Sequence, residues 1–338
     1  MPTLGKTTVL GTGAWGTALT CALARAQAET QVQAPLALWS NDTQALQQLR
    51  EQRSSPQLPG ITLPDHIALP DSLDEALHDT QTLVLAVPSQ VMRTVGQTLL
   101  PFLQRPRNSP CLLINVAKGI EASSLLLMHE VIAHVLAQTP YRYVTLSGPT
   151  FALETAEGRP TSVVAASFCT DDAQSAVQLF RSQNLNVYPS DDPIGVELGG
   201  SLKNVFAIAV GTCDALNLGF NARAALITHS LEEMGRIAAA KQGKAATLAG
   251  LAGMGDLILT ATGDLSRNRR VGMELAQGKT LDEVLKTLGH VAEGVDTARS
   301  AHALAQQLGV HTPIIHAVYR MLHEHYPVKQ AVTDMLAG

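Results

Sequence analysis

One lysine stands in a sequence setting that favours proton transfer, and a second lysine and an aspartate add charges that could act on a substrate. Lys203 lies beside two glycines and is followed by the nearly uncharged run Val205 to Val210, so we expect its ammonium to be partly buried. Burial lowers a lysine pKa from about 10.4 toward the range in which the amine transfers protons. Lys118 follows the apolar run Cys111 to Val116, where it could orient a phosphate or polarise a carbonyl. Asp256, among glycines, supplies a carboxylate. Taken alone, each lysine could equally be a solvated surface residue.

Donors suited to an anion are concentrated between Ser266 and Arg270. Arg267 offers a guanidinium fork, Asn268 an amide and Ser266 a hydroxyl, and together these groups match the oxygens of a phosphate dianion. As an isolated string, such a segment is also typical of a solvated basic face. Its interpretation as a phosphate site therefore depends on the other motifs.

A glycine-rich turn near the start of the chain predicts dinucleotide binding. The string Gly11-Thr12-Gly13-Ala14-Trp15-Gly16 lies between the apolar segment Thr7 to Leu10 and the alanine-rich stretch Ala14 to Ala26. Gly11 permits a tight turn, Gly13 lets the backbone approach a pyrophosphate, and Gly16 lets the helix pack closely on the sheet. This position, at the first strand-to-helix turn, favours nucleotide binding over a purely structural turn.

The residues after the second predicted strand leave the choice of dinucleotide open. An acidic residue about 20 residues beyond the glycines would bind the ribose 2′-hydroxyl of NAD. The strand ends at Trp39-Ser40-Asn41-Asp42, in which Asn41 is neutral and Asp42 comes slightly late. The cofactor could therefore be NADP or NAD.

These groups require a scaffold of strands and helices, and the sequence predicts one in two parts. Apolar runs typical of strands alternate with helical stretches up to about residue 190, which indicates a parallel sheet. These runs are Thr7 to Leu10, Leu36 to Trp39, Thr82 to Val87, Cys111 to Val116, Tyr143 to Leu146, Ser162 to Ala166 and Asn186 to Tyr188. From Gly195 onward the pattern is helical alone. We expect an α/β dinucleotide-binding domain over residues 1–190, a polar hinge at Pro189 to Pro193, and an all-helical substrate-binding and catalytic domain over residues 191–338.

Three further segments follow predicted strands, at the carboxyl edge where open α/β sheets bind their ligands. They are Val87-Pro88-Ser89, Ala117-Lys118-Gly119-Ile120-Glu121 and Ser147-Gly148-Pro149-Thr150-Phe151-Ala152. Because the carboxyl ends of parallel strands share one edge, these segments are candidates for the walls of the binding site.

Composition and spacing argue against several other classes of protein. A net charge of −5, with 24 basic residues scattered along the chain, lacks the footprint of a nucleic-acid binder. The four cysteines form no C-x-x-C pair and favour a reducing cytoplasm. No apolar run approaches the ~18 residues of a membrane helix, and no signal peptide is evident. His129 and His134 are five residues apart, whereas metalloprotease ligands are four apart, so no metal site is expected.

Taken together, the motifs resemble those of the bacterial-type NAD(P)-dependent glycerol-3-phosphate dehydrogenases, over nearly the whole chain. The matching segments are Gly11 to Leu19, Val87-Pro88-Ser89, Lys118-Gly119-Ile120-Glu121, Ser147 to Ala152 with Glu154, Gly195 to Asn204, Gly219 to Ala222, Leu251 to Leu257, Ser266 to Arg269 and Ala292-Glu293-Gly294. Ala14 departs from the serine of many relatives, and the connection Gln27 to Pro35 is longer than is usual in the family.

The resemblance implies a Rossmann-like domain followed by a helical domain, a cytoplasmic homodimer, and a role in supplying glycerol 3-phosphate for phospholipid synthesis. It assigns proton transfer to Lys203. It implies substrate contacts at Lys118, Gly148, Thr150, Lys203, Asp256, Ser266, Arg267 and Asn268. It implies cofactor contacts at Gly11, Gly13, Ala14, Trp15, Gly16, Asn41, Lys118, Ala152, Arg267, Val291 and Glu293, with Asn41 near the adenosine ribose.

The reaction implied is reversible hydride transfer between NAD(P)H and the C2 carbonyl of dihydroxyacetone phosphate. Two alternatives stay open at this point. A β-hydroxyacid or phosphogluconate dehydrogenase would share the domains and a catalytic lysine but would bind a carboxylate. A non-catalytic redox sensor would keep the nucleotide fold, although the joint presence of Lys118, Lys203, Asp256 and Arg267 argues against it.

Overall fold

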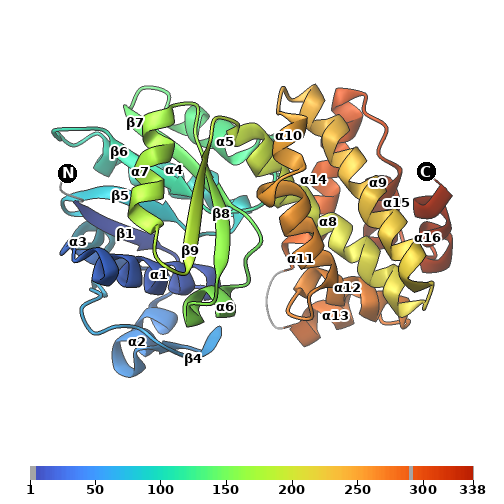
Figure 1. Ribbon diagram of the computed structural model, residues 1–338, viewed down its shortest axis with the longest axis horizontal. Coiled ribbons are helices and arrows are strands. Elements are labelled where there is room, and N and C mark those ends of the chain that lie inside the picture. The colour runs from blue at the N-terminus through green and yellow to red at the C-terminus, as the bar shows by residue number, and fades with distance from the viewer. Residues whose placement is uncertain (1–4, 289–291, 338) are drawn as a thin grey trace. The chain divides into compact units, whose positions relative to one another are not determined.

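The computed structural model describes residues 5–288 and 292–337. The chain divides into two compact units. The first extends to Ala117 and resumes from Met128 to Pro193, and the second comprises Lys118–Leu127 and the residues from Ile194 onward. Figure 1 draws the first unit in blue to green and most of the second in yellow to red. The segment Lys118–Leu127 therefore leaves the α/β unit and packs with the helices, although it directly follows a strand.

The first unit is built on a seven-stranded sheet with the strand order β2-β1-β5-β6-β7-β8-β9 (Figure 1). The strands are β1 (Lys6–Leu10), β2 (Leu36–Trp39), β5 (Thr80–Leu85), β6 (Cys111–Asn115), β7 (Tyr141–Ser147), β8 (Thr161–Ala166) and β9 (Leu185–Ser190). The chain passes from β1 outward to β2 and then returns to β5 on the other side of β1. The order of strands thus reverses between β1 and β5, which is the point where doubly wound sheets bind nucleotides.

One pair of strands differs from the parallel sheet that the sequence predicted. Within the seven-stranded sheet, all neighbouring strands are parallel except β7 and β8, which are antiparallel. Their connection contains only the six-residue helix α6 (Ala152–Glu157). A parallel crossover carries the chain back along the whole strand, usually through a longer helix. This short connection instead lets the chain reverse its direction at the sheet.

Helices cover the sheet of the first unit. They are α1 (Ala14–Thr30), α2 (Thr43–Gln52), α3 (Leu73–Leu77), η1 (Ser89–Val91), α4 (Met92–Leu103), α5 (Met128–Val135), α6 and α7 (Thr170–Phe180). Right-handed crossovers that run in opposite directions from the switch point place α1 and α4 on opposite faces. Helix α1 is rich in alanine and buried over most of its length, so it lies close to the sheet. Its start at Ala14 is thereby fixed directly after the glycine turn.

The sequence did not predict a small hairpin, β3 (Ser54–Ser55) and β4 (Leu58–Thr62). The two strands pair in an antiparallel sheet of their own. Their short length and the proline and glycine within β4 hide any alternation of polar and apolar residues. The hairpin is held by tertiary contacts, because buried Leu58 packs with Ala18 of α1 and Ala156 of α6.

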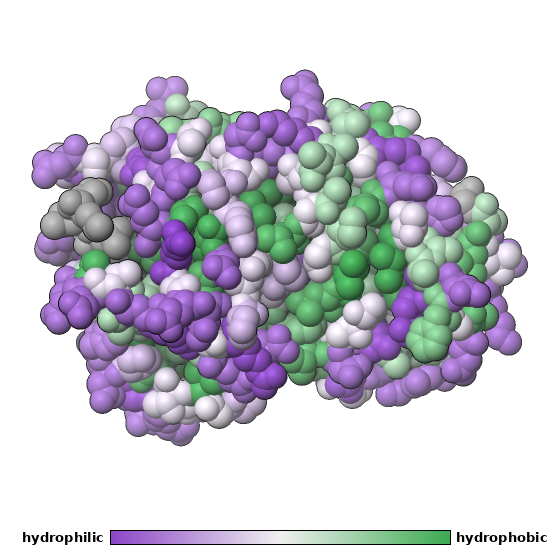
Figure 2. Space-filling model, viewed as in Figure 1, coloured by the Kyte–Doolittle hydropathy of each residue, from purple (hydrophilic) through white to green (hydrophobic). Residues whose placement is uncertain are grey.

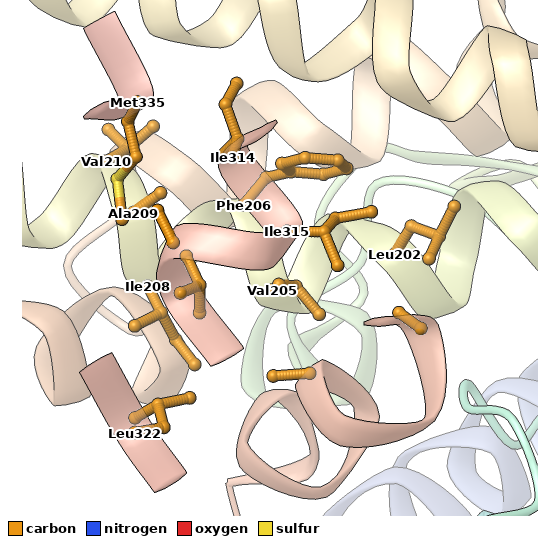
Figure 3. Close-up of a cluster of buried hydrophobic side chains, with 14 of the residues drawn as sticks. Leu202, Val205, Phe206, Ile208, Ala209, Val210, Ile314, Ile315, Leu322 and Met335 are labelled. Atoms are coloured by element: carbon orange, nitrogen blue, oxygen red, sulfur yellow. The ribbon is translucent and has the colours of Figure 1, made fainter. Parts of the chain in front are cut away.

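The second unit is helical. Its elements are α8 (Pro193–Ala215), α9 (Gly219–Ala240), α10 (Ala245–Leu248), the π-helical turn η2 (Leu251–Gly255), α11 (Asp256–Thr262), α12 (Arg267–Ala276), α13 (Leu281–Leu288), α14 (Glu293–Leu308), α15 (Pro313–His323) and α16 (Val328–Ala337). Apolar residues of α8, such as Val205 and Phe206, form the centre of its core with Ile314 and Ile315 of α15 and Met335 of α16 (Figure 3). The predicted class, a Rossmann-like domain followed by a helical domain, is confirmed.

Two segments are long and apolar enough to cross a membrane, contrary to the expectation that no apolar run approaches that length. They are Pro193–Ala215, which is mostly buried in the protein, and Ala245–Thr262, which is less so. Burial of the first accounts for its composition, because a core helix that is enclosed on all sides is apolar all round.

Candidate active site

A buried cluster of charges joins three residues that lie far apart in the sequence. Asp256 is fully buried and accepts hydrogen bonds from both Lys118 and Lys203, one on each carboxylate oxygen. The distance from Lys118 Nζ to Asp256 Oδ2 is 2.7 Å. Lys203 also donates to Thr260 Oγ1 at 3.0 Å. The two ammonium groups therefore share one carboxylate, and the cluster carries a net positive charge.

The fold positions each member of this cluster through packing of the backbone. Lys203 lies on α8, and Asp256 is the first residue of α11, directly after the π-helical turn η2. Helix α8 approaches that turn so closely that a Cβ on Gly199 would lie 2.4 Å from the carbonyl oxygen of Ala252. Only glycine fits at this contact. The close contact between α8 and the turn thus places the Asp256 carboxylate beside Lys203. Single π turns of this kind are frequent at functional sites.

Burial makes Lys203 suitable for proton transfer near neutral pH. Its pKa is lowered to about 8, chiefly because burial penalises the ammonium. The Asp256 carboxylate raises the pKa in part, and the charge of Lys118 lowers it. The sequence predicted a partly buried Lys203 ammonium, and the residue is buried more deeply than that, with 5% of it exposed. A lysine with this pKa holds its proton at pH 7 but releases it readily.

Glu293 belongs to the same electrostatic neighbourhood. Burial raises its pKa, while the charges of Arg267, Lys118 and Lys203 lower it. It is the first residue of α14, where the helix N-terminus favours a negative charge. The second unit thus gathers three cations and two carboxylates around a common region.

The segment from Ser266 to Asn268 begins helix α12. Ser266 is the N-cap, because its hydroxyl oxygen accepts from the backbone N–H of Arg269 at 3.2 Å. Asn268 donates through Nδ2 to Asn204 Oδ1 at 2.9 Å and accepts from the backbone N–H of Gly294 at 3.0 Å. Its amide therefore joins the residues that follow Lys203 and Glu293. Sequence reasoning missed this bridging contact, which leaves the second amide N–H of Asn268 to donate elsewhere.

Arg269 anchors the start of α12 to α8. Its Nε and one terminal nitrogen donate to Asp214 Oδ2 at 3.0 and 2.8 Å, and the Asp214 side chain is nearly buried. Arg223 donates to the other oxygen of the same carboxylate at 2.6 Å. Arg267, by contrast, is exposed. Within the basic segment, Arg269 thus has a structural partner and Arg267 remains the residue suited to an anion.

The glycine turn of the first unit forms the cradle that a dinucleotide phosphate requires. A Cβ on Gly11 would lie 2.2 Å from the carbonyl oxygen of Ala86, and a Cβ on Gly16 would lie 2.0 Å from that of Gly11. Beside Gly13 lies Gln57, in the turn of the β3–β4 hairpin, with its Oε1 3.3 Å from the Cβ position. Sequence reasoning did not identify Gln57. The geometry of the turn fits a pyrophosphate at the start of α1.

Replacement of Gly16 by alanine is expected to weaken NADH binding by roughly tenfold or more and to lower the free energy of unfolding by about 1–3 kcal/mol, because the added methyl group displaces the turn. Titration calorimetry and urea unfolding measure the two effects. Gly235→Ala is the matched control, since nothing lies within 4 Å of its Cβ position. Equal affinities for NADH in Gly16→Ala and Gly235→Ala would contradict this role of Gly16.

The other predicted cofactor and substrate residues of the first unit lie at strand ends. Asn41 follows β2 and is exposed, whereas the indole nitrogen of Trp15 is buried with no hydrogen-bond partner among the described residues. Gly148 and Thr150 follow β7, with Thr150 Oγ1 donating to the carbonyl oxygen of Gly148 at 3.2 Å, and Ala152 begins α6. Val291 lies outside the described residues.

Comparison with known proteins assigns the chain to a family. Residues 6–174 match the family described as NAD-dependent glycerol-3-phosphate dehydrogenase N-terminus, and residues 192–333 match the corresponding C-terminus. A protein of Thiobacillus denitrificans named glycerol-3-phosphate dehydrogenase [NAD(P)+] is 46% identical over 332 residues, which cover 98% of this chain and 97% of that protein. The protein of the same name from Geobacter metallireducens is 45% identical over 333 residues, which cover 98% and 96%.

A solved structure agrees with these similarities in sequence. The crystal structure of glycerol-3-phosphate dehydrogenase from Coxiella burnetii superposes with a TM-score of 0.92 at 36% identity and covers 100% of both chains. The similarity therefore extends over both units, and it includes the stretches that carry the glycine turn and the buried lysine. On these grounds the chain belongs to the NAD-dependent glycerol-3-phosphate dehydrogenase family.

Proposed function

We propose that this protein interconverts dihydroxyacetone phosphate and sn-glycerol 3-phosphate, with NAD(P) as the redox partner. The observation that carries this proposal is the buried contact of Lys203 with Asp256 and Thr260, in a unit that also presents Arg267 at the start of a helix. Reduction of a phosphorylated ketone requires one proton donor and one phosphate-binding group. The second unit offers both.

Lys203 is the proton donor in the direction of carbonyl reduction. The nicotinamide supplies hydride to the substrate C2 when the dinucleotide is bound. Lys203 Nζ gives its proton to the forming alkoxide, and Lys118 stabilises the negative charge that develops on this oxygen. Asp256 keeps both ammonium groups in position through its two carboxylate oxygens. In the oxidation of glycerol 3-phosphate, neutral Lys203 takes the proton instead.

The substrate phosphate binds at the start of α12. The exposed guanidinium of Arg267, the hydroxyl of Ser266 and the second amide N–H of Asn268 supply donors of three kinds. The carbonyl carbon of the substrate lies two bonds from the ester oxygen of its phosphate. Binding of the phosphate therefore also orients the carbonyl group for reaction. Gly148 and Thr150 of the first unit complete the set of proposed substrate contacts.

In this proposal the domain predicted over residues 1–190 holds the dinucleotide, and the domain predicted over residues 191–338 holds the substrate. Gly11, Gly13 and Gly16 receive the pyrophosphate, with backbone donors at Ala14. The remaining proposed cofactor contacts are Trp15, Asn41, Lys118, Ala152, Arg267, Val291 and Glu293.

A direct test is the decrease of NADH or NADPH absorbance on adding dihydroxyacetone phosphate to the purified protein. Oxidation that depends on this substrate supports the proposal. Activity with hydroxyacids and none with dihydroxyacetone phosphate would instead identify a β-hydroxyacid dehydrogenase. Binding of the dinucleotide without turnover of either substrate would favour a sensor.

The pH dependence of the reaction is expected to follow Lys203, whose pKa is about 8. Reduction uses the ammonium, so kcat/KM for dihydroxyacetone phosphate should be level below that pKa and fall roughly tenfold for each pH unit above it. Oxidation uses the neutral amine, so kcat/KM for glycerol 3-phosphate should rise with pH and level off above the same value. Initial rates in both directions from pH 6.5 to 9.5 measure this. Profiles without opposite slopes in the two directions would contradict the assignment.

The proposal has four further parts. They are homodimer formation, a cytoplasmic location, absence of stable membrane insertion and a role in phospholipid synthesis. Exposed apolar side chains of the helical unit, Leu218, Phe220, Ile258 and Leu265, are consistent with a buried interface in an oligomer. Figure 2 shows apolar residues gathered on the viewed face of this unit.

Light scattering of the purified protein, compared with Phe220→Ser, tests the oligomeric state. A mass of one chain for the unaltered protein would contradict the dimer.

A further inference from the structure

His323, the last residue of α15, joins that helix to α14 through both nitrogens of its ring. Its Nε2 lies 3.1 Å from the carbonyl oxygen of Val295, and its Nδ1 lies 3.3 Å from a terminal nitrogen of Arg299. Val295 and Arg299 are about one turn apart on α14, so the half-buried imidazole spans the beginning of that helix.

These two partners fix the protonation state of the His323 ring. A backbone carbonyl can only accept a hydrogen bond, so Nε2 carries a proton and donates it to Val295. An arginine can only donate, so Nδ1 has no proton and accepts from Arg299. The ring is therefore neutral and in one defined tautomer. A proton on Nδ1 would break the contact with Arg299 and place two positive charges side by side.

The charged groups around His323 come from both helices. Burial has the largest influence on the pKa of the imidazole and lowers it. The Val295 carbonyl raises this pKa, and the charge of Arg299 lowers it again. The carboxylates of Asp296 on α14 and of Glu324, directly after α15, raise it. The net shift of the pKa is downward, so the ring is neutral at pH 7 and gains its second proton only below the ordinary value of about 6.5.

A row of aromatic rings continues from His323 along the contact between α14 and α15. The ring of Tyr319 lies 5.5 Å from that of His323 and 4.3 Å from that of His302, centroid to centroid. His302, on α14, also lies 4.9 Å from His316 on α15. Burial and the neighbouring His316 lower the pKa of His302. The packing of the two helices thus favours neutral imidazoles at more than one position.

The turn that His323 contacts begins with a residue of the candidate site. Helix α14 starts at Glu293, two residues before Val295. Between them, the backbone N–H of Gly294 donates to Asn268 of α12. A Cβ on Gly294 would also lie 2.7 Å from the carbonyl oxygen of Asn204, on α8. The first turn of α14 is therefore held by α8 and α12 at Gly294 and by α15 at Val295.

We propose that His323 is a positioning residue: its neutral ring holds the first turn of α14, and with it Glu293, in place, and protonation of the ring releases this turn. The inference rests on the proposed function, in which Glu293 contacts the dinucleotide. Binding of NADH should therefore weaken in acid. The titration of Lys203, whose pKa is about 8, acts on the alkaline side instead.

Dissociation constants of NADH, measured by titration calorimetry on the full chain between pH 5.5 and 7.5, test the proposal. We expect the constant of the unaltered protein to rise roughly three- to tenfold toward pH 5.5, as for the loss of about one hydrogen bond. His323→Ala lacks both hydrogen bonds, so it should bind NADH more weakly than the unaltered protein at pH 7.5 and should show no further weakening in acid. Unaltered affinity in His323→Ala at pH 7.5 would overturn the proposal.

The variant His323→Gln separates protonation from loss of the contacts. A glutamine amide can accept from Arg299 and donate to Val295, and it does not titrate. NADH affinity should therefore be retained at pH 7.5 and stay level down to pH 5.5. The matched control His311→Gln replaces an exposed histidine of the same unit and should keep the weakening in acid. An unchanged acid weakening in His323→Gln would overturn the role of His323.

The His323 ring can also be observed without any activity. Long-range ¹H–¹⁵N NMR spectra of the imidazoles, with the His323 signals identified by their loss in His323→Gln, should show a proton on Nε2 alone at pH 7.5. A proton on Nδ1 at that pH would overturn the proposal while leaving the dehydrogenase function intact. The expected tautomer without binding of NADH at any pH would overturn the proposed function, and with it the effect of His323 on the cofactor.

Discussion

Replacing Lys203 by alanine is expected to lower kcat for dihydroxyacetone phosphate reduction by about 10²–10⁴-fold, the range that a positioned general acid contributes. The alkoxide would then have to take its proton from water, in a site where Lys118 remains paired with Asp256. KM should change much less, because the phosphate contacts at the start of α12 are retained. Steady-state kinetics at pH 7 measure the two constants separately.

Two controls separate loss of the proton donor from loss of the fold. NADH affinity of Lys203→Ala should be unchanged, because the glycine turn lies in the other unit. Added methylammonium or ethylammonium should restore part of the activity, since a small amine can enter the space that the side chain leaves. Retention of near-normal kcat in Lys203→Ala would show that another group transfers the proton.

The sequence predicted the strands of the first unit well where the strand core is a continuous apolar run. The second strand, Leu36–Trp39, has the predicted limits, and β6 ends one residue early at Asn115. The third predicted strand, Thr82 to Val87, is instead Thr80–Leu85, because the chain leaves the sheet two residues before the apolar run ends. Ala86 and Val87 continue the apolar run but are only half-buried, so apolar character alone does not mark the residue at which the strand ends.

Long-range contacts account for what the sequence could not predict. The grouping of Lys118–Leu127 with the helices depends on Ile120 and Leu127, which are fully buried in the core of the second unit. Nothing in the local pattern indicates which core a short apolar segment joins. The same holds for Gln57 at the glycine turn, whose position is set by packing of Leu58 and not by any motif of its own.

The local sequence pattern indicated which charged residues belong to the site, but it did not indicate how they contact one another. The uncharged run after Lys203 predicted a buried ammonium, and this is what the structure has. The pairing of Lys203 with Asp256 spans 53 residues, and no local pattern indicates it. The bridge from Asn268 to Asn204 and Gly294 was not expected at all. An asparagine amide can bind a substrate or other residues of the protein equally well. The spacing of residues in the sequence therefore cannot show which of these partners it has.

Removing the charge of Asp256 is expected to destabilise the second unit more than any other single change discussed above. Asp256→Asn leaves two buried ammonium groups without their carboxylate, and loss of one partner of a buried ion pair costs about 3–5 kcal/mol. The free energy of unfolding, measured in urea at pH 7, should fall by that amount. Glu232→Gln is the matched control, because its side chain is 57% exposed and its removal should change stability by less than about 0.5 kcal/mol.

The same variant should also change the pH profile, since the Asp256 carboxylate raises the pKa of Lys203. Without this carboxylate, the pKa of Lys203 should fall below about 8. The decline in the rate of reduction should then begin at a lower pH. Removing the second charge in Asp256→Asn with Lys203→Met should recover part of the lost stability, because one unpaired ammonium is gone. Strictly additive losses in this double variant would mean that the two side chains stabilise the protein independently. Lys203 and Asp256 would then contribute separately to the stability of the protein. In that case the Asp256 carboxylate could not be the group that holds the Lys203 ammonium in place.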